Sequence, residues 1–216
     1  MSKSTVYLVD DHKILRESLV FLLKQEGELE VIGEAADGQD AYREILQLKP
    51  DIAILDISIP QLNGLDLAAK LKQELPNIKI IMLTMHKSEE FVARAYSIGV
   101  NGYVLKENAL EELLKCIRVV IEGRTYLSED MVQTVLNGFV DHHMQGGALN
   151  QESISARERE IVQLLAEGSS NKEIADILNL SIKTVETHRS NIMKKLGFKS
   201  ITDLVLYAVR NHMIEP

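Results

Sequence analysis

The sequence predicts an α/β fold, a doubly wound parallel sheet of five strands, followed by a second, smaller all-helical domain. Residues 1–124 alternate short apolar runs with amphipathic segments, which is the pattern of repeated strand–helix units. Runs such as residues 52–55 are continuously apolar, as is typical of parallel strands that are covered on both faces. Residues 155–158 and 170–173 both have the Ser-x-x-Glu spacing that marks helix starts.

Five strand–helix units account for the first domain, residues 1–124. Its strands are expected at residues 5–10, 29–34, 51–56, 78–83 and 101–105. Its helices are expected near residues 13–26, 38–48, 64–74, 88–98 and 109–122. Strands that alternate with helices in this way form a parallel sheet with helices on both sides.

Residues 125–152 are predicted to be a linker, because two adjacent glycines interrupt a stretch that has no apolar period. A helix within this linker is expected from Ser128 to about Phe139. Residues 153–216 form the second domain, with short connections between four helices. Their expected starts are capped by Ser155, Ser170, Ser181 and Ser200.

The net charge of −8 is divided unevenly between the two domains. Residues 1–149 carry 15 Lys and Arg against 23 Asp and Glu, whereas residues 150–216 carry nine of each. Within the second group, residues 181–200 have a net charge of +4. An acidic first domain therefore precedes a domain with a basic stripe, which is the part suited to nucleic acid.

Composition also excludes some classes of protein. No apolar run approaches the roughly 18 residues that span a bilayer, so a membrane protein is not expected. The first residues lack the features of a signal peptide, and the single Cys116 has no partner for an internal disulfide. We expect a cytoplasmic protein in which Cys116 is a packing residue.

Polar side chains stand where several of the predicted strands end. The first strand ends in Asp10-Asp11, the third in Asp56 and the fourth in Thr84. The fifth runs through Tyr103 to Lys106. Because ligands of doubly wound sheets bind at the carboxyl ends of the strands, we expect these side chains to converge.

Three converging carboxylates indicate a divalent cation, since without one they would raise each other's pKa. Mg²⁺ accepts carboxylate oxygens, retains waters and bridges to phosphate oxygens. Asp56 is then the predicted phosphoacceptor, with Lys106 stabilising the charge on the transferred group and Thr84 donating a hydrogen bond to it. Thr84 and Tyr103 are the predicted switch residues, which move once the phosphoryl group is present.

Each of these residues also has an ordinary structural interpretation. Asp11 suits the N-cap of the following helix, Asp56 could be a loop carboxylate, and Lys106 could be a solvated lysine. His86 and Ser58 lie close to the site in sequence, where they could modulate loss of the phosphoryl group, but we favour surface roles for them.

These motifs resemble the receiver domain of bacterial response regulators over about residues 5–122. The matching residues are Asp10-Asp11-His12, Asp56-Ile57-Ser58-Ile59-Pro60, Asn63-Gly64, Thr84 and Lys106. The resemblance implies that Mg²⁺ binds to Asp10, Asp11, Asp56 and the backbone carbonyl of Ser58. It also implies that a phosphohistidine on a sensor histidine kinase donates the phosphoryl group. Met85 departs from the family pattern, in which a smaller residue usually follows Thr84.

The third helix of the second domain has one apolar and one polar face. Val185, His188, Ile192 and Leu196 recur at spacings of three to four residues. The opposite face is rich in hydrogen-bonding groups and suits the major groove of DNA. Base-edge contacts are predicted for Glu186, Thr187, Ser190 and Asn191. Contacts nearer the phosphate backbone are predicted for Lys172, Lys183, Thr184, Arg189, Lys194 and Lys195.

Residues 155–209 resemble the LuxR-type helix-turn-helix, and the two domains together resemble NarL/FixJ-type response regulators. The matching residues are 155–160, 171–175 and 184–189. The resemblance implies a transcription regulator that binds double-stranded DNA, works with RNA polymerase and is a homodimer when active. Dimerisation is expected through the last helix, with Leu204, Tyr207 and Ala208 exposed.

Two other functions are consistent with parts of the sequence. An aspartyl phosphohydrolase would use a similar Asp, Mg²⁺ and Lys arrangement, but such enzymes need a second Asp where this chain has Ser58. A constitutive DNA-binding protein with a vestigial acidic domain would bind DNA equally well with and without a phosphodonor. We expect a binding switch that catalyses only its own phosphorylation and slow dephosphorylation, not an enzyme with turnover.

Overall fold

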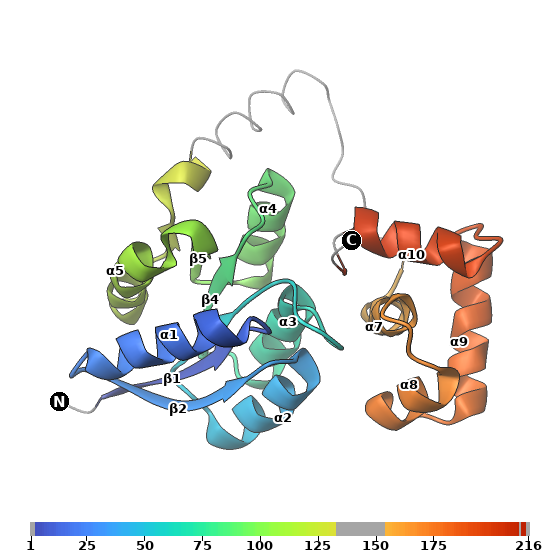
Figure 1. Cartoon of the computed structure of the whole chain (residues 1–216), viewed down its shortest axis with the longest axis horizontal. Coiled ribbons are helices and arrows are strands. Elements are labelled where there is room, and N and C mark those ends of the chain that lie inside the picture. Colours follow the sequence, from blue (N-terminus) through green and yellow to red (C-terminus); the bar gives the residue numbers. More distant parts are fainter. Residues whose placement is uncertain (1–2, 133–153, 212, 215–216) are drawn as a thin grey trace.

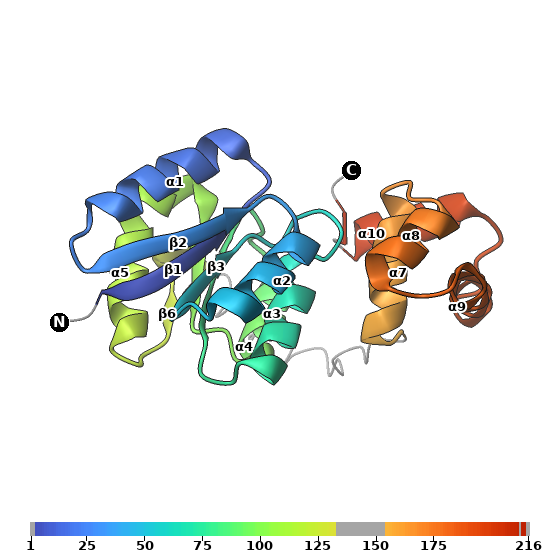
Figure 2. The same cartoon turned by 90° about the horizontal axis from the view of Figure 1, so that it is seen from below.

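A computed structural model of the chain describes residues 3–132, 154–211 and 213–214. Within these residues, the helices are too short or too polar to cross a bilayer. The chain forms an α/β domain and a smaller helical domain, which lie side by side in two perpendicular views (Figures 1 and 2).

The first domain is a parallel sheet with the strand order β2-β1-β3-β4-β5-β6. The strands are β1 (Ser4–Val9), β2 (Leu29–Ala35), β3 (Ile52–Leu55), β4 (Lys79–Thr84), β5 (Gly102–Leu105) and β6 (Tyr126–Leu127). The chain leaves β1 for β2 on one side and returns to β3 on the other, so the order reverses between β1 and β3. This is the position at which doubly wound sheets bind their ligands.

Helices cover both faces of the sheet, as expected from its apolar strands (Figure 1). They are α1 (Lys13–Gln25), α2 (Gly38–Leu48), α3 (Gly64–Glu74), α4 (Glu89–Ile98) and α5 (Ala109–Ile121), with a short 3₁₀ turn at Lys106–Asn108. Side chains of α1 and α5 pack on one face and those of α2, α3 and α4 on the other. The predicted doubly wound parallel fold is therefore confirmed.

The prediction of five strands is wrong, because β6 adds a sixth. Tyr126 donates its backbone amide to the carbonyl of Asn101 at 2.9 Å, and Ser128 donates to that of Tyr103 at 3.1 Å. These bonds extend the parallel pairing beyond β5, within the segment predicted to be a linker. The helix expected from Ser128 lies mostly outside the described residues.

The second domain has four helices around one apolar core. They are α7 (Ala156–Ala166), α8 (Asn171–Leu178), α9 (Ile182–Lys195) and α10 (Ile201–Arg210). The predicted N-caps are confirmed, since each capping serine accepts a hydrogen bond from the third backbone amide of its helix. The expected exposure of α10 is wrong for Leu204 and Ala208, which are fully buried in this core, and Tyr207 packs against Phe198.

The two domains meet through α7 and the loop between β3 and α3. Backbone atoms of this loop form hydrogen bonds with the side chains of Gln163 on α7 and of Glu167, the C-cap of that helix. Helix α9 lies on the side of its domain that faces away from the sheet in both views (Figures 1 and 2). The contact between the domains thus leaves α9 uncovered.

Candidate functional site

Asp10 and Asp56 are neighbours at the carboxyl edge of the sheet. Val9 of β1 is in register with Leu55 of β3, so the residue after each strand occupies an adjacent position. The Asp56 amide donates to the carbonyl of Val9 at 2.9 Å, which fixes this position. Both carboxylates are almost completely buried. The convergence predicted from the sequence is therefore present for these two residues.

Lys106 supplies a cation between the two carboxylates. Thr84 of β4 is in register with Leu105 of β5, so Lys106 begins at the same edge of the sheet. Its Nζ lies 2.7 Å from Asp56 Oδ2 and 2.9 Å from Asp10 Oδ2. One ammonium therefore faces two carboxylates, which leaves the buried group with a net negative charge.

Asp11, the third carboxylate of the predicted cation site, also lies here. Single ligand atoms of Asp10, Asp11, His12 and Asp56 all lie within 4.8 Å of one another. Asp10 Oδ2 is buried, and the Lys106 ammonium lies 2.9 Å from it. A set of carboxylate oxygens this close together fits a hard divalent cation such as Mg²⁺. Asp11 is not a helix cap, because the N-cap of α1 is His12 and that helix has no side-chain cap.

The net effect of burial and charge is to raise the pKa of both Asp56 and Lys106. Burial raises the pKa of Asp56, and the negative charge of Asp10 raises it further, although Lys106 opposes both effects. Burial alone would lower the pKa of Lys106, but its attraction to Asp56 outweighs this and raises it. Lys106 therefore remains a cation. Keeping the buried Asp56 carboxylate ionised costs free energy, and a second cation would reduce that cost.

Thr84 and Tyr103 lie where the switch prediction requires them. Thr84 is fully buried at the end of β4, and its Oγ1 accepts the His86 amide at 3.3 Å. Tyr103 is fully buried in β5, and its hydroxyl donates to the carbonyl of His86 at 2.9 Å. The loop after β4 thus contacts both residues. Met85 is 55% exposed.

The assignment of His86 and Ser58 to surface roles missed a contact beside the site. Ser58 Oγ lies 2.8 Å from His86 Nε2, and the His86 ring stacks on Phe91. This contact joins the loop after β3 to the loop after β4. Both residues stand two positions beyond a site residue, Asp56 or Thr84, and that spacing is the signal in the sequence that could have indicated it.

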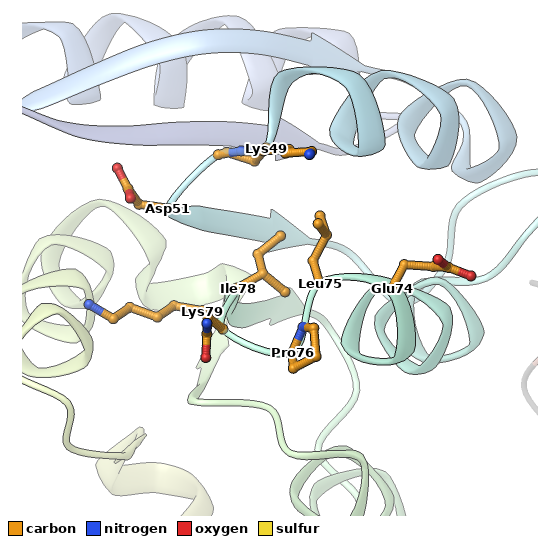
Figure 3. A pocket seen from close by; sticks show the side chains of 9 residues that line it. Lys49, Asp51, Glu74, Leu75, Pro76, Ile78 and Lys79 are labelled. Carbon is orange, nitrogen blue, oxygen red and sulfur yellow. The ribbon is translucent and has the colours of Figure 1, made fainter.

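One hollow among the described residues lies away from this site. It has a volume of about 400 Å³ and is lined by the segments that enter β3 and β4 (Figure 3). Lys49, Asp51 and Lys79 lie around it at the amino edge of the sheet (Figure 3). The carboxylates of the candidate site are at the opposite, carboxyl edge, where α/β folds bind their ligands.

Helix α9 presents the polar face predicted for DNA contact. Val185 and Ile192 are fully buried against the helical core. The predicted base-reading residues are all exposed: Glu186, Thr187, Ser190 and Asn191. Lys172, Lys183 and Lys194 are also exposed, whereas Thr184 and Arg189 are half-buried. An exposed helix with hydrogen-bonding groups on one face has the form that enters a major groove.

One of the lysines that were predicted to contact the DNA backbone forms an ion pair within the protein. Lys195 Nζ lies 2.9 Å from Glu158 Oε2, so this lysine joins α9 to α7. His188 is half-buried on the inner side of α9, as the apolar stripe predicted. Lys195 is therefore a weaker candidate for the phosphate backbone than Lys194.

Comparison with known families identifies both domains. Residues 6–118 match the family described as response regulator receiver domain, and residues 152–208 match that of bacterial regulatory proteins, luxR family. The chain belongs to the LuxR family of two-component response regulators. The predicted family is thus confirmed, and with it a DNA-binding function.

Similar response regulators match this one along most of its length. The oxygen regulatory protein NreC of Staphylococcus aureus strain MRSA252 is 38% identical over 214 residues, 97% of this chain and 99% of NreC. A LuxR-family response regulator from Aurantimonas sp. SI85-9A1 has 32% identity and a TM-score of 0.62, covering 64% of this chain and 99% of that one. RcsB of Salmonella enterica serovar Typhimurium, solved on promoter DNA with the phosphomimetic BeF₃⁻, has 27% identity and a TM-score of 0.60, covering 95% of this chain and 98% of RcsB.

Proposed function

We propose that this response regulator is switched by Mg²⁺-dependent phosphorylation of Asp56, with a sensor histidine kinase as the phosphoryl donor. The observation that carries the proposal is the pairing of two buried carboxylates, Asp10 and Asp56, with the single ammonium of Lys106. That arrangement holds a nucleophilic oxygen beside a cation at the edge of the sheet where ligands bind.

Each residue of the site has a separate task in the transfer. An Asp56 oxygen attacks phosphorus, the bond from phosphorus to the donor histidine breaks, and its electron pair stays on the histidine. Lys106 stabilises the negative charge on the phosphoryl oxygens, and Thr84 donates a hydrogen bond to one of them. Mg²⁺ would be held by Asp10, Asp11, Asp56 and the Ser58 carbonyl, where it supplies positive charge to the phosphoryl oxygens.

The output of the switch is the binding of double-stranded DNA by α9. We propose that the active form is a homodimer in the cytoplasm that works with RNA polymerase, and that the chain has no turnover chemistry beyond its own phosphorylation and dephosphorylation. The solved complex of RcsB with promoter DNA and a phosphomimetic supports this proposal, because RcsB covers nearly the whole chain.

The test is labelling of the full chain by acetyl phosphate, followed by intact mass. The wild-type chain should gain one phosphoryl group with Mg²⁺ and none with EDTA, and Asp56→Asn should gain none. Asp51→Asn is the matched control, because Asp51 lies at the other end of β3 and binds Thr5. Labelling of Asp56→Asn at the wild-type level would refute the assignment.

The same samples distinguish the other two functions. A DNA selection with and without acetyl phosphate should enrich a binding sequence much more strongly with the phosphodonor. Equal enrichment would favour a constitutive DNA-binding protein. Continued turnover of a small phosphoester by the wild-type chain would favour a phosphohydrolase.

A further inference from the structure

His12 belongs to the cluster of ligand atoms at the sheet edge, but the proposed Mg²⁺ site gives it no task. Mg²⁺ takes oxygen ligands, which the three carboxylates and the Ser58 carbonyl supply. The ligand atoms that lie within 4.8 Å of one another nevertheless come from four residues: Asp10, Asp11, His12 and Asp56. Imidazole suits first-row transition ions such as Zn²⁺, whereas carboxylate and water suit Mg²⁺. The site therefore has a ligand of a kind that Mg²⁺ does not need.

Backbone hydrogen bonds hold His12 beside the carboxylates. The His12 amide donates to Asp10 Oδ1 at 2.8 Å, and the His12 carbonyl accepts the Arg16 amide at 3.0 Å. The Arg16 guanidinium also donates to the Asp10 carbonyl, which ties the end of β1 to the first turn of α1. The backbone of His12 is thus fixed, and rotation about two side-chain bonds is the freedom that its ring retains.

The His12 ring is turned toward the carboxylates. Its Nδ1 lies 2.9 Å from Asp11 Oδ1 and 3.5 Å from Asp10 Oδ1. Ligand atoms around a tetrahedral Zn²⁺ stand about 3.3 Å apart, because its bonds to nitrogen and oxygen are about 2.0 to 2.1 Å long. The two measured spacings are close to that value. The side chains of His12 and Asp11 are 58% and 36% exposed, so an ion from solvent can reach them.

The charges of this cluster match a divalent ion. Lys106 Nζ lies 3.5 Å from His12 Nδ1, in addition to its contacts with the carboxylates of Asp10 and Asp56. Three of the four ligand residues thus surround one ammonium. Three carboxylates against one ammonium leave two negative charges, and a divalent cation balances both of them.

Four ligand residues are the number that closes a zinc site. Structural Zn²⁺ sites have four protein ligands, whereas catalytic sites have three and keep one position for water or substrate. Mg²⁺ keeps several waters, which phosphoryl oxygens can replace. Zn²⁺ bound by all four residues would therefore have no position for the phosphoryl group, in contrast to Mg²⁺ at the same edge of the sheet.

We propose that His12 makes the phosphorylation site a binding site for Zn²⁺, which displaces Mg²⁺ and blocks transfer to Asp56. The ion is bound by His12 Nδ1 together with the carboxylates of Asp10, Asp11 and Asp56, and its presence keeps the regulator unphosphorylated. This inference rests on the proposed function, because it concerns the cation site of that reaction.

The test measures the affinity of the full chain for Zn²⁺ and for Mg²⁺ by calorimetric titration, in the wild type and in His12→Asn. Asparagine is favoured at an N-cap, which is the position of His12 in α1, so the variant should fold. We expect its Zn²⁺ affinity to fall by about tenfold or more, since loss of a group that merely supports a ligand already costs about 10- to 100-fold. Its Mg²⁺ affinity should change by less than about twofold, because Mg²⁺ prefers oxygen ligands.

Two further measurements identify the ligand. His142→Asn is the matched control, since it removes one imidazole from the adjacent pair His142-His143, and it should bind Zn²⁺ as the wild type does. Zinc-edge X-ray absorption of the wild type with one equivalent of Zn²⁺ needs no variant. It should show one imidazole and otherwise oxygen around the ion. Oxygen alone, or two imidazoles, would overturn the assignment of His12.

Labelling of Asp56 by acetyl phosphate at a fixed Mg²⁺ concentration tests the effect on the reaction. Added Zn²⁺ should stop labelling of the wild type and of His142→Asn. His12→Asn should need about tenfold more Zn²⁺ for the same loss of labelling. Full labelling of a wild-type chain that has Zn²⁺ bound through His12 would overturn the block.

The outcomes separate this inference from the proposed function. Absence of Mg²⁺-dependent labelling in the wild type, with Zn²⁺ affinity still reduced in His12→Asn, would refute the proposed function and leave His12 as a zinc ligand. Normal labelling, with equal Zn²⁺ affinity in the wild type and His12→Asn, would refute the role of His12 alone. An equal loss of Mg²⁺ and Zn²⁺ affinity in His12→Asn would also overturn it, because His12 would then only support the loop.

Discussion

The Asp56 carboxylate shares one buried ammonium with Asp10, so the site carries one negative charge more than its cations balance. Asp56→Asn removes this excess and leaves Lys106 paired with Asp10. Without divalent cations at neutral pH, we therefore expect the variant to be more stable than the wild type by on the order of 1 kcal/mol. Urea unfolding of both chains in EDTA measures this difference. Added Mg²⁺ should then stabilise the wild type more than the variant.

The sign of the pH dependence follows from the raised pKa of Asp56. The folded chain holds the Asp56 proton to a higher pH than the unfolded chain, whose Asp has its ordinary pKa of 3.8. The wild type therefore loses stability relative to Asp56→Asn as pH rises from 3.8 through the raised pKa. The stability difference should be largest at neutral pH and vanish below pH 3.8. A difference that grows as the pH falls would contradict this interpretation.

Lys106 has a different role from Asp56, because its positive charge is needed both before and after the phosphoryl transfer. Lys106→Ala should reduce the rate of Asp56 phosphorylation by about 100-fold, because enzymes lose about this much when one preorganised group that stabilises the transition-state charge is removed. It should also destabilise the fold in EDTA by about 3 kcal/mol, since two buried carboxylates lose their common partner. Lys87→Ala, which removes an exposed lysine paired with Glu107, is the control. A wild-type phosphorylation rate in Lys106→Ala would exclude Lys106 from the reaction.

At the scale of the residue, the functional side chains that stand at the ends of strands could be predicted from the sequence. Asp10, Asp56, Thr84 and Lys106 each follow or end a short apolar strand, and parallel strands bring their ends together. The Ser58 and His86 contact could not be derived in this way. Both residues lie in loops, and no periodicity defines the direction in which a loop side chain points.

At the scale of the element, α9 combines two kinds of DNA contact that separate variants can distinguish. Asn191→Ala should weaken binding to a selected duplex by about 1 to 3 kcal/mol and relax the preference for one base pair. Lys194→Ala should weaken binding similarly for all sequences and reduce the slope of log K against log salt by about one. Fluorescence anisotropy over a series of salt concentrations measures both quantities. Loss of sequence preference in Lys194→Ala with an unchanged slope would reverse the two assignments.

The starts of the helices in the second domain could be predicted, because the capping serines and the periodicity of apolar residues indicate the same positions. The serines before α7, α8, α9 and α10 accept hydrogen bonds at the predicted positions. The outward face of α10 was not predictable, because the helix is apolar on more than one side and its period does not say which side meets the core. Leu204 and Ala208 face the core, whereas Leu206 remains 48% exposed. Strand β6 escaped prediction because two residues are too few for a period.

At the scale of the whole molecule, the contact between the domains is set by groups that have no sequence signature. Gln163 lies inside a helix that its apolar residues already explain, and its partners are backbone atoms of a loop a hundred residues away. Pattern analysis identifies which residues belong to a helix but not which distant backbone groups they bind. The arrangement of the domains therefore depends on the three-dimensional structure.

That arrangement leaves α9 uncovered while Gln163 and Glu167 bind the loop after Asp56, so exposure of the recognition helix cannot be what phosphorylation changes (Figure 2). What it can change is the freedom of two copies to pair on DNA. On a duplex with one half-site, we therefore expect acetyl phosphate to alter the affinity of the chain by less than about twofold. On a duplex with two half-sites, paired binding should strengthen by about tenfold or more, because the second domain then binds at a high effective concentration. Anisotropy titrations of the two duplexes measure these factors, and an equal gain on both would mean that phosphorylation acts on α9 itself.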